Sequence, residues 1–185
     1  MKSALILLAP GCEEMEAVIT MDTLRRAGIH VVSAGIDPGE VLASRGVRLL
    51  PDAVLHELEE AKSFDVLILP GGMPGTERLC EEVAVRDLVC WYAGQPDRRL
   101  AAICAAPLVL QQAQVLAEKR FTAYPGLKHR FVQGHYVDEA VVMDGRLVTS
   151  QGPATSFAFA LTLVELLAGK EARQAVAEGL LWPDS

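Results

Sequence analysis

The chain has 185 residues, of which 51% are hydrophobic and 22% are charged, as is usual for a soluble globular protein. Its formal net charge of −7 argues against nucleic acid and anionic membrane surfaces as partners, and no apolar run is long enough to span a membrane. Four cysteines without a CxxC pair indicate neither a zinc site nor a disulfide scaffold. We therefore expect one domain over residues 1–185 in a reducing, cytoplasmic setting.

The first part of the chain predicts a strand, a helix and a second strand. The first strand is a continuous apolar run, which suits a sheet buried on both faces. The helix has an apolar stripe running from Met15 to Leu24, acidic residues in its first turn and arginines in its last. The predicted ranges are Ser3–Ala9, Glu13–Ala27 and Ile29–Ala34. This order implies a parallel strand pair with a right-handed crossover.

The middle of the chain predicts an antiparallel excursion, a short helix or turn, a buried strand and one or two helices. These ranges are Val41–Leu50, Ala53–Ala61, Asp65–Leu69 and Thr76–Ala93. A strand that ends at Ile103 follows, and after it a helix that extends to about Leu116.

The last part predicts a mixed segment, a hairpin across Asp144-Gly145, an apolar helix and a closing segment. The ranges are Lys119–Gly134, Val141–Asp144 with Leu147–Ser150, Phe157–Leu167 and Glu171–Leu181. Because strands alternate with helices along the chain, we predict an α/β fold, a three-layer α/β/α sandwich around a mostly parallel sheet.

The stretch Arg99–Leu110 is the most informative part of the sequence. Its apolar run ends at Cys104, two alanines follow, and Pro107 suits the first turn of a helix. This strand, turn and helix place Cys104 at the carboxyl edge of the sheet, where open α/β sheets bind ligands. The position favours a reactive thiol, and the alternative is an ordinary buried core cysteine.

A reactive Cys104 needs help to ionise. A free thiol has a pKa of about 8.5. A helix N-terminus lowers that pKa by only about one or less. A protonated carboxyl that donates a hydrogen bond to the thiolate is the best available help, and Glu13 or Glu16 would supply it from the start of the first helix. Periodicity does not choose between the two, and such acids also simply favour a helix N-terminus.

Glycines follow the strand that ends at Leu69. The N–H groups of Gly71-Gly72, together with that of Ala105, would form an anion hole near Cys104, although a tight turn alone also requires glycine. The sequence contains no phosphate loop, dinucleotide fingerprint or metal-ligand spacing, so we expect neither a cofactor nor a metal.

Four stretches of the chain form a recognisable set, in order and with matching spacing over nearly its whole length. They are Glu13–Val18, Leu69–Gly72, Ala101–Pro107 and Thr149–Ser156. Together they resemble the ThiJ/PfpI superfamily, also called DJ-1/PfpI, in the branch of the parkinsonism-associated protein deglycase and bacterial YajL.

The resemblance implies a flavodoxin-like sandwich, a homodimer, and Cys104 as an oxidation-sensitive nucleophile on a strand-to-helix elbow. It implies that Glu16 is the protonated acid bonded to Cys104. It also implies that Gly72 and Ala105 form the anion hole, and that Gly71 and Arg45 line the pocket.

Two other pocket positions depart from the family pattern. Tyr124 stands where better-studied members have a histidine, and Gln151 replaces a second arginine. The resemblance thus implies that a nearby general base is missing and that the affinity for anions is lower in this chain.

Members of this branch are reported as glyoxalases, as deglycases and as redox-sensing chaperones. We therefore expect a stress-response protein in which Cys104 acts on a small aldehyde or dicarbonyl such as methylglyoxal, or on its protein adducts. The alternative is a redox-sensing chaperone with little turnover, whose cysteine oxidises to the sulfinic acid.

Overall fold

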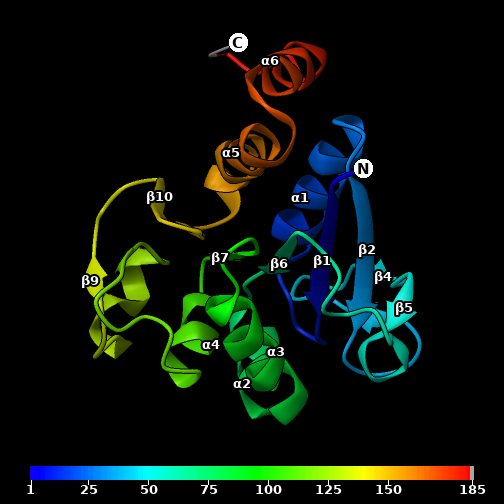
Figure 1. Cartoon of the computed structure of the whole chain (residues 1–185). Coiled ribbons are helices and arrows are strands. Elements are labelled where there is room, and N and C mark those ends of the chain that lie inside the picture. The colour runs from blue at the N-terminus through cyan, green and yellow to red at the C-terminus, as the bar shows by residue number, and fades with distance from the viewer. Residues whose placement is uncertain (184–185) are drawn as a thin grey trace.

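The computed structural model describes residues 1–183 and is built on a seven-stranded sheet (Figure 1). The strand order is β10-β11-β7-β6-β1-β2-β5, and every neighbouring pair is parallel except β10 with β11. The strands are β1 (Ser3–Leu8), β2 (His30–Gly35), β5 (Ala53–Val54), β6 (Val66–Leu69), β7 (Arg99–Ile103), β10 (Val141–Asp144) and β11 (Leu147–Ser150). The last two residues of the expected single domain lie outside the described residues.

Helices cover both faces of this sheet, as the sandwich prediction requires (Figure 1). One face packs against α2, α3 and α4, and the other against α1 and α5, with α6 packed on α5. The helices are α1 (Glu14–Arg26), α2 (Met73–Glu81), α3 (Val83–Gly94), α4 (Pro107–Gln112), α5 (Ser156–Ala168) and α6 (Lys170–Gly179). Three short 3₁₀ turns also occur, at Leu55–Glu57, Pro125–Arg130 and Pro153–Thr155.

Two small strand pairs lie outside the main sheet. The antiparallel pair β3 (Val41–Leu42) and β4 (Arg48–Leu49) is the excursion expected from the sequence, and β8 (Arg120–Phe121) pairs in parallel with β9 (His135–Tyr136). The hairpin of β10 and β11 has the predicted bounds.

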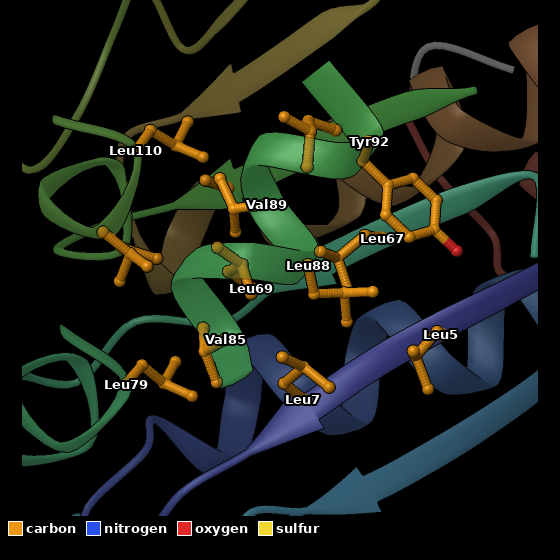
Figure 2. Close-up of a cluster of buried hydrophobic side chains, with 14 of the residues drawn as sticks. Leu5, Leu7, Leu67, Leu69, Leu79, Val85, Leu88, Val89, Tyr92 and Leu110 are labelled. Carbon is orange, nitrogen blue, oxygen red and sulfur yellow. The ribbon is translucent and has the colours of Figure 1, made fainter. Parts of the chain in front are cut away.

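The central strands are buried on both sides, which explains their continuous apolar sequences. Alternate residues of β1 point to opposite faces, so Leu5 and Leu7 join the cluster under α3 while Ile6 joins the cluster under α1. Figure 2 shows the α3 side, where leucines of β1 and β6 meet Val89 and Tyr92. This packing fixes the strand ends on which the candidate site is built.

Three predictions differ from the structure in the type of element or by more than two residues. Ala53–Val54 is an edge strand that pairs with β2, where a helix or turn was expected. Helix α2 begins at Met73, before the expected Thr76, because Pro74 fits the first helical turn. The helix after Cys104 ends at Gln112, short of Leu116.

The early end of α4 has a local cause. Gln114 has φ 60°, and the Val115 N–H donates to the Leu110 carbonyl over 2.9 Å. A left-handed residue with a bond of this kind is a usual way to terminate a helix. The apolar Val115 and Leu116 therefore lie outside the helix.

The burial pattern of helix α1 departs from that of a typical amphipathic helix. Met15 and Val18, from its apolar stripe, are 52% and 43% exposed, whereas Glu16 and Thr20 are buried. Leu24, at the other end of the apolar stripe, is completely buried. The first turns of the helix thus place Glu16 and Thr20 against the sheet and leave Met15 and Val18 exposed, while Leu24 packs in the core.

Among residues 1–183, no helix combines the length and the apolar character that a membrane crossing requires.

Candidate active site

Cys104 lies at the carboxyl end of β7, in the turn that leads to α4. Its φ is 63°, a left-handed conformation that is unusual for a residue other than glycine. The backbone is held on both sides, because the Cys104 N–H donates to the Ser150 carbonyl over 2.9 Å and the Tyr124 N–H donates to the Cys104 carbonyl over 2.8 Å. Strain of this kind persists only where neighbouring structure fixes it, and it is characteristic of active sites.

Glu16 reaches this turn from the first turns of α1 and is completely buried. Its Oε2 accepts a hydrogen bond of 2.7 Å from the Gly71 N–H, and its carboxyl lies close enough to Cys104 for each group to shift the pKa of the other. Its Oε1 is buried and has no hydrogen-bond partner among the residues described. Because an unpaired buried carboxylate oxygen is unfavourable, this atom is the natural place for a proton.

Burial raises the pKa of Glu16 from its usual 4.5 to about 7, even though the Gly71 N–H and Cys104 oppose the shift. The carboxyl therefore carries a proton in a large share of molecules at neutral pH. A group poised in this way is suited to accept and return a proton.

The surroundings of Cys104 raise its pKa, to about 12, mainly through burial and the negative charge of Glu16. The N–H groups of Gly72 and Ala105 act in the opposite direction. The pKa of Cys104 is therefore raised, whereas the sequence predicted that the start of α4 would lower it. Helix α4 has only six residues and hence a short dipole.

The two groups are therefore best treated as one coupled pair that shares a single negative charge. While the charge is on Glu16, the thiol stays protonated. When the proton is on Glu16, the repulsion is removed, and the charge moves to the sulfur, facing the N–H groups of Gly72 and Ala105.

Gly71 is required for this close packing. A Cβ at position 71 would lie 2.6 Å from the Cys104 Cβ, 2.8 Å from the Glu16 Oε2 and 2.9 Å from the Ala105 nitrogen. Gly72 has φ 86°, and a Cβ there would lie 2.5 Å from the Gly11 carbonyl oxygen. The Gly71 N–H donates to Glu16, so of the two glycines only Gly72 has its N–H beside the sulfur.

Comparison with known proteins assigns this chain to a family. A family model described as the DJ-1/PfpI family matches residues 2–166. The chain belongs to the DJ-1/PfpI family. The flavodoxin-like α/β fold implied by the sequence resemblance is that of the solved family structures, with which this structure superimposes closely.

Three DJ-1 proteins illustrate how close the similarity is. The Drosophila melanogaster protein dj-1beta is 49% identical over 183 residues, covering 97% of each chain, and its crystal structure superimposes with a TM-score of 0.91. The glutathione-independent glyoxalase DJR-1.2 of Caenorhabditis elegans is 40% identical over 92% of this chain and 91% of its own. An oxidized Toxoplasma gondii DJ-1 has a TM-score of 0.93 at 36% identity, covering 99% of this chain and 100% of its own.

The residues that depart from the DJ-1/PfpI pattern lie at the margin of the site. Tyr124 contacts Cys104 through its backbone N–H, while its side chain is 49% exposed and lies beside Gly152. Gln151 follows β11, and its side-chain amide donates to the Asp138 carboxylate over 2.7 Å. Neither side chain occupies a position between Cys104 and Glu16.

Arg45 lies in the turn between β3 and β4, and its exposed side chain shows no contact with Cys104. Its backbone N–H donates to the Glu14 carboxylate over 2.9 Å. The neighbouring Ser44 hydroxyl lies 2.9 Å from carboxylate oxygens of both Glu13 and Glu14. Sequence reasoning missed Ser44, whose only signal was its place beside Arg45.

No group of three or more His, Cys, Asp or Glu side chains in the described part of the chain could hold a metal ion. The structure therefore brings together Cys104, Glu16, Gly71, Gly72 and Ala105, with Tyr124 attached by its backbone.

Proposed function

We propose that this chain is a DJ-1-like stress-response protein in which Cys104 adds to small dicarbonyls such as methylglyoxal or to their protein adducts. The observation that supports this most directly is the pairing of the Cys104 thiol with a buried carboxyl whose pKa is raised to about 7. A nucleophile beside a group that exchanges protons at neutral pH is the basic requirement for addition to a carbonyl.

The proposed reaction begins with the charge on Glu16. The Glu16 carboxylate takes the thiol proton while the sulfur bonds to the aldehyde carbon, and the carbonyl π electrons move to its oxygen. The N–H groups of Gly72 and Ala105, which interact with the sulfur before the reaction, stabilise this oxyanion. Glu16 then returns the proton to the oxygen, giving a neutral hemithioacetal.

The same carboxylate would complete a glyoxalase reaction. Glu16 would move the proton of the hemithioacetal carbon to the adjacent carbonyl carbon, while the hydroxyl proton of the hemithioacetal passes to the carbonyl oxygen, which yields a thioester of lactate. Water would then hydrolyse the thioester and release the thiol, so the overall change is methylglyoxal plus water to lactate. Because Tyr124 replaces the family histidine, we propose that turnover is slow.

A glutathione-free assay tests this proposal, with lactate measured by NMR. We expect the wild type to convert methylglyoxal, Cys104→Ser to lose at least a hundredfold in rate, and Glu16→Gln to lose a similar amount. Cys90→Ser is the matched control, because Cys90 is exposed on α3 and should leave the rate unchanged. Equal rates in the wild type and Cys104→Ser would reject the proposal.

The second candidate function is redox sensing with little turnover. Its specific support is the contrast between two thiols, because Cys104 is half-buried beside the N–H groups of Gly72 and Ala105 whereas Cys12 is completely buried. One peroxide molecule would convert the Cys104 thiolate to the sulfenate and water, and a second would give the sulfinate, held by Gly72 and Ala105. Peptide mapping after graded peroxide should find two oxygens on Cys104 first, and an even spread over all four cysteines would exclude this function.

We also propose that residues 1–185 form one domain that assembles as a cytoplasmic homodimer without a cofactor. The outward apolar side chains of α1 support a dimer, since exposed apolar residues on one helix face often mark an interface. Sedimentation of the wild type against Val18→Asp would test this assembly.

A further inference from the structure

A cavity of about 70 Å³ lies at the edge of the sheet opposite to Cys104. Its walls are the end of α3, the start of β7, the segment after α4 and the turn between β10 and β11. Leu100 lines it, and Leu100 and Cys104 are four residues apart on one strand, which corresponds to roughly 13 Å. The cavity is thus separate from the proposed reaction site.

Part of the lining of this cavity is apolar. It comprises the side chains of Leu100, Val115 and Leu147, together with Tyr92 and Ala93 of α3. The Tyr92 hydroxyl does not offer a polar contact there, because it is engaged with the carbonyls of Ala61 and Phe64 at 2.9 and 3.2 Å. An apolar ligand body would therefore fit this lining.

The remaining lining residues are three cations and one carboxylate, in a chain whose net charge is −7. Asp144 is engaged with Lys119 at 3.4 Å and with the Arg120 N–H at 2.8 Å, and both interactions lower the pKa of Asp144. Arg98 is near Asp65 and Asp97, at 3.6 and 3.7 Å. Arg146 forms no ion pair with any residue in 1–183.

We propose that this cavity binds a small monocarboxylate with a short aliphatic chain, with Arg146 pairing the carboxylate. A guanidinium suits a carboxylate because its N–H groups form two parallel hydrogen bonds to the two oxygens. The volume is about half that of a core cavity that accommodates benzene, so the apolar body has room for about three carbons. An inorganic oxyanion would leave the apolar lining unused.

Amide chemical shifts of the labelled protein during titration with sodium butyrate test this proposal. We expect saturable shifts at Ala93, Leu100 and Val115. Arg146→Gln should weaken the binding at least tenfold, and Ala93→Leu should abolish it by filling the cavity while leaving every charge in place. Arg86→Gln is the matched control. Arg86 is exposed on α3, the helix that carries Ala93, and this variant should bind butyrate as the wild type does.

Two further probes separate charge from shape. Butyramide has the same body without the charge, and sulfate has charge without the body, so both should bind at least tenfold more weakly than butyrate. Equal binding of either probe, unchanged binding by Arg146→Gln, or butyrate shifts confined to Gly72 and Ala105 would overturn the proposal. Because Cys104 takes no part in it, the Cys104→Ser protein should bind butyrate normally.

Discussion

The two faces of the sheet bury different kinds of side chain, although the same strands supply both. On the α3 side the helix contributes valines, a leucine and Tyr92 (Figure 2). The Tyr92 hydroxyl donates to the carbonyls of Ala61 and Phe64. On the α1 side the helix buries Glu16, Thr20 and Thr23. One face is built almost entirely by apolar packing, and the other includes polar groups that packing alone would not select.

The difference also extends to hydrogen bonding. Within the described residues, three buried side-chain atoms on α1 have no partner, namely the Glu16 Oε1 and the hydroxyls of Thr20 and Thr23, whereas α2 has one such atom, the Thr76 hydroxyl, and α3 has none. Unpaired buried polar atoms reduce stability. The comparison teaches that the α3 side mainly stabilises the fold, whereas the α1 side gives up some stability to place a carboxyl beside a thiol.

Leu7→Ala should give the largest effect and tests the α3 side. Leu7 is completely buried in the cluster of Figure 2, so its truncation should lower the free energy of unfolding by about 2–5 kcal/mol. Urea unfolding measures the loss. The alkylation rate of Cys104 in the folded variant should stay within about twofold of the wild type, and a large change would show that the two faces are not independent.

Glu16 should make stability depend on pH. With its folded pKa near 7 and an unfolded value near 4.5, its contribution is complete below pH 4.5 and is lost as the pH rises through 7. The shift corresponds to about 3 kcal/mol. Unfolding at pH 5 and pH 8 should show this fall in a Cys104→Ala background. Glu16→Gln in the same background should show almost none of it, and an equal fall in both proteins would contradict the assignment.

Gly71→Ala should disturb the site and the fold together. The added methyl group would meet the Cys104 Cβ at 2.6 Å, so we expect a loss of about 1–3 kcal/mol and a large change in thiol reactivity. Gly94→Ala is the matched control, because a Cβ there meets nothing within 4 Å, and it should be neutral or slightly stabilising. Similar thermal unfolding of the two variants would show that position 71 tolerates a side chain.

Thr23→Val should give the smallest effect, a gain of about 1 kcal/mol. The replacement keeps the shape of a fully buried side chain and removes a hydroxyl without a partner. Thermal unfolding can measure a gain of this size, and Thr162→Val, which removes a hydroxyl bonded to the Ala158 carbonyl, provides the contrast. A destabilised Thr23→Val would mean that its hydroxyl has a favourable interaction on α1.

The sequence predicted most of the fold because its strands are strongly apolar. The runs around Leu5 and Leu67 could only be strands buried on both faces, and Asp144-Gly145 marked the hairpin turn. The end of α4 was not predictable in the same way, since the left-handed Gln114 is not a glycine. Likewise, Ala53–Val54 is too short to show strand alternation and depends on pairing with β2.

The site was only partly predictable from the residues. The turn after Ile103 identified Cys104, but periodicity could not separate Glu13 from Glu16, because choosing between them requires knowing how α1 packs. The structure places Glu16 beside the sulfur and Glu13 beside Ser44. The direction of the pKa shift of Cys104 could not be predicted either, since it depends on burial and on the charge of Glu16, which is distant in sequence.

The left-handed backbone at Cys104 has a consequence for how this protein could change over time. Glycine would adopt that conformation without the roughly 1–2 kcal/mol that a side chain costs there. Selection for thermal stability alone would therefore favour replacing Cys104 with glycine, which removes the thiol. If related proteins retain a cysteine at this position, selection has acted on the chemistry of the thiol rather than on stability.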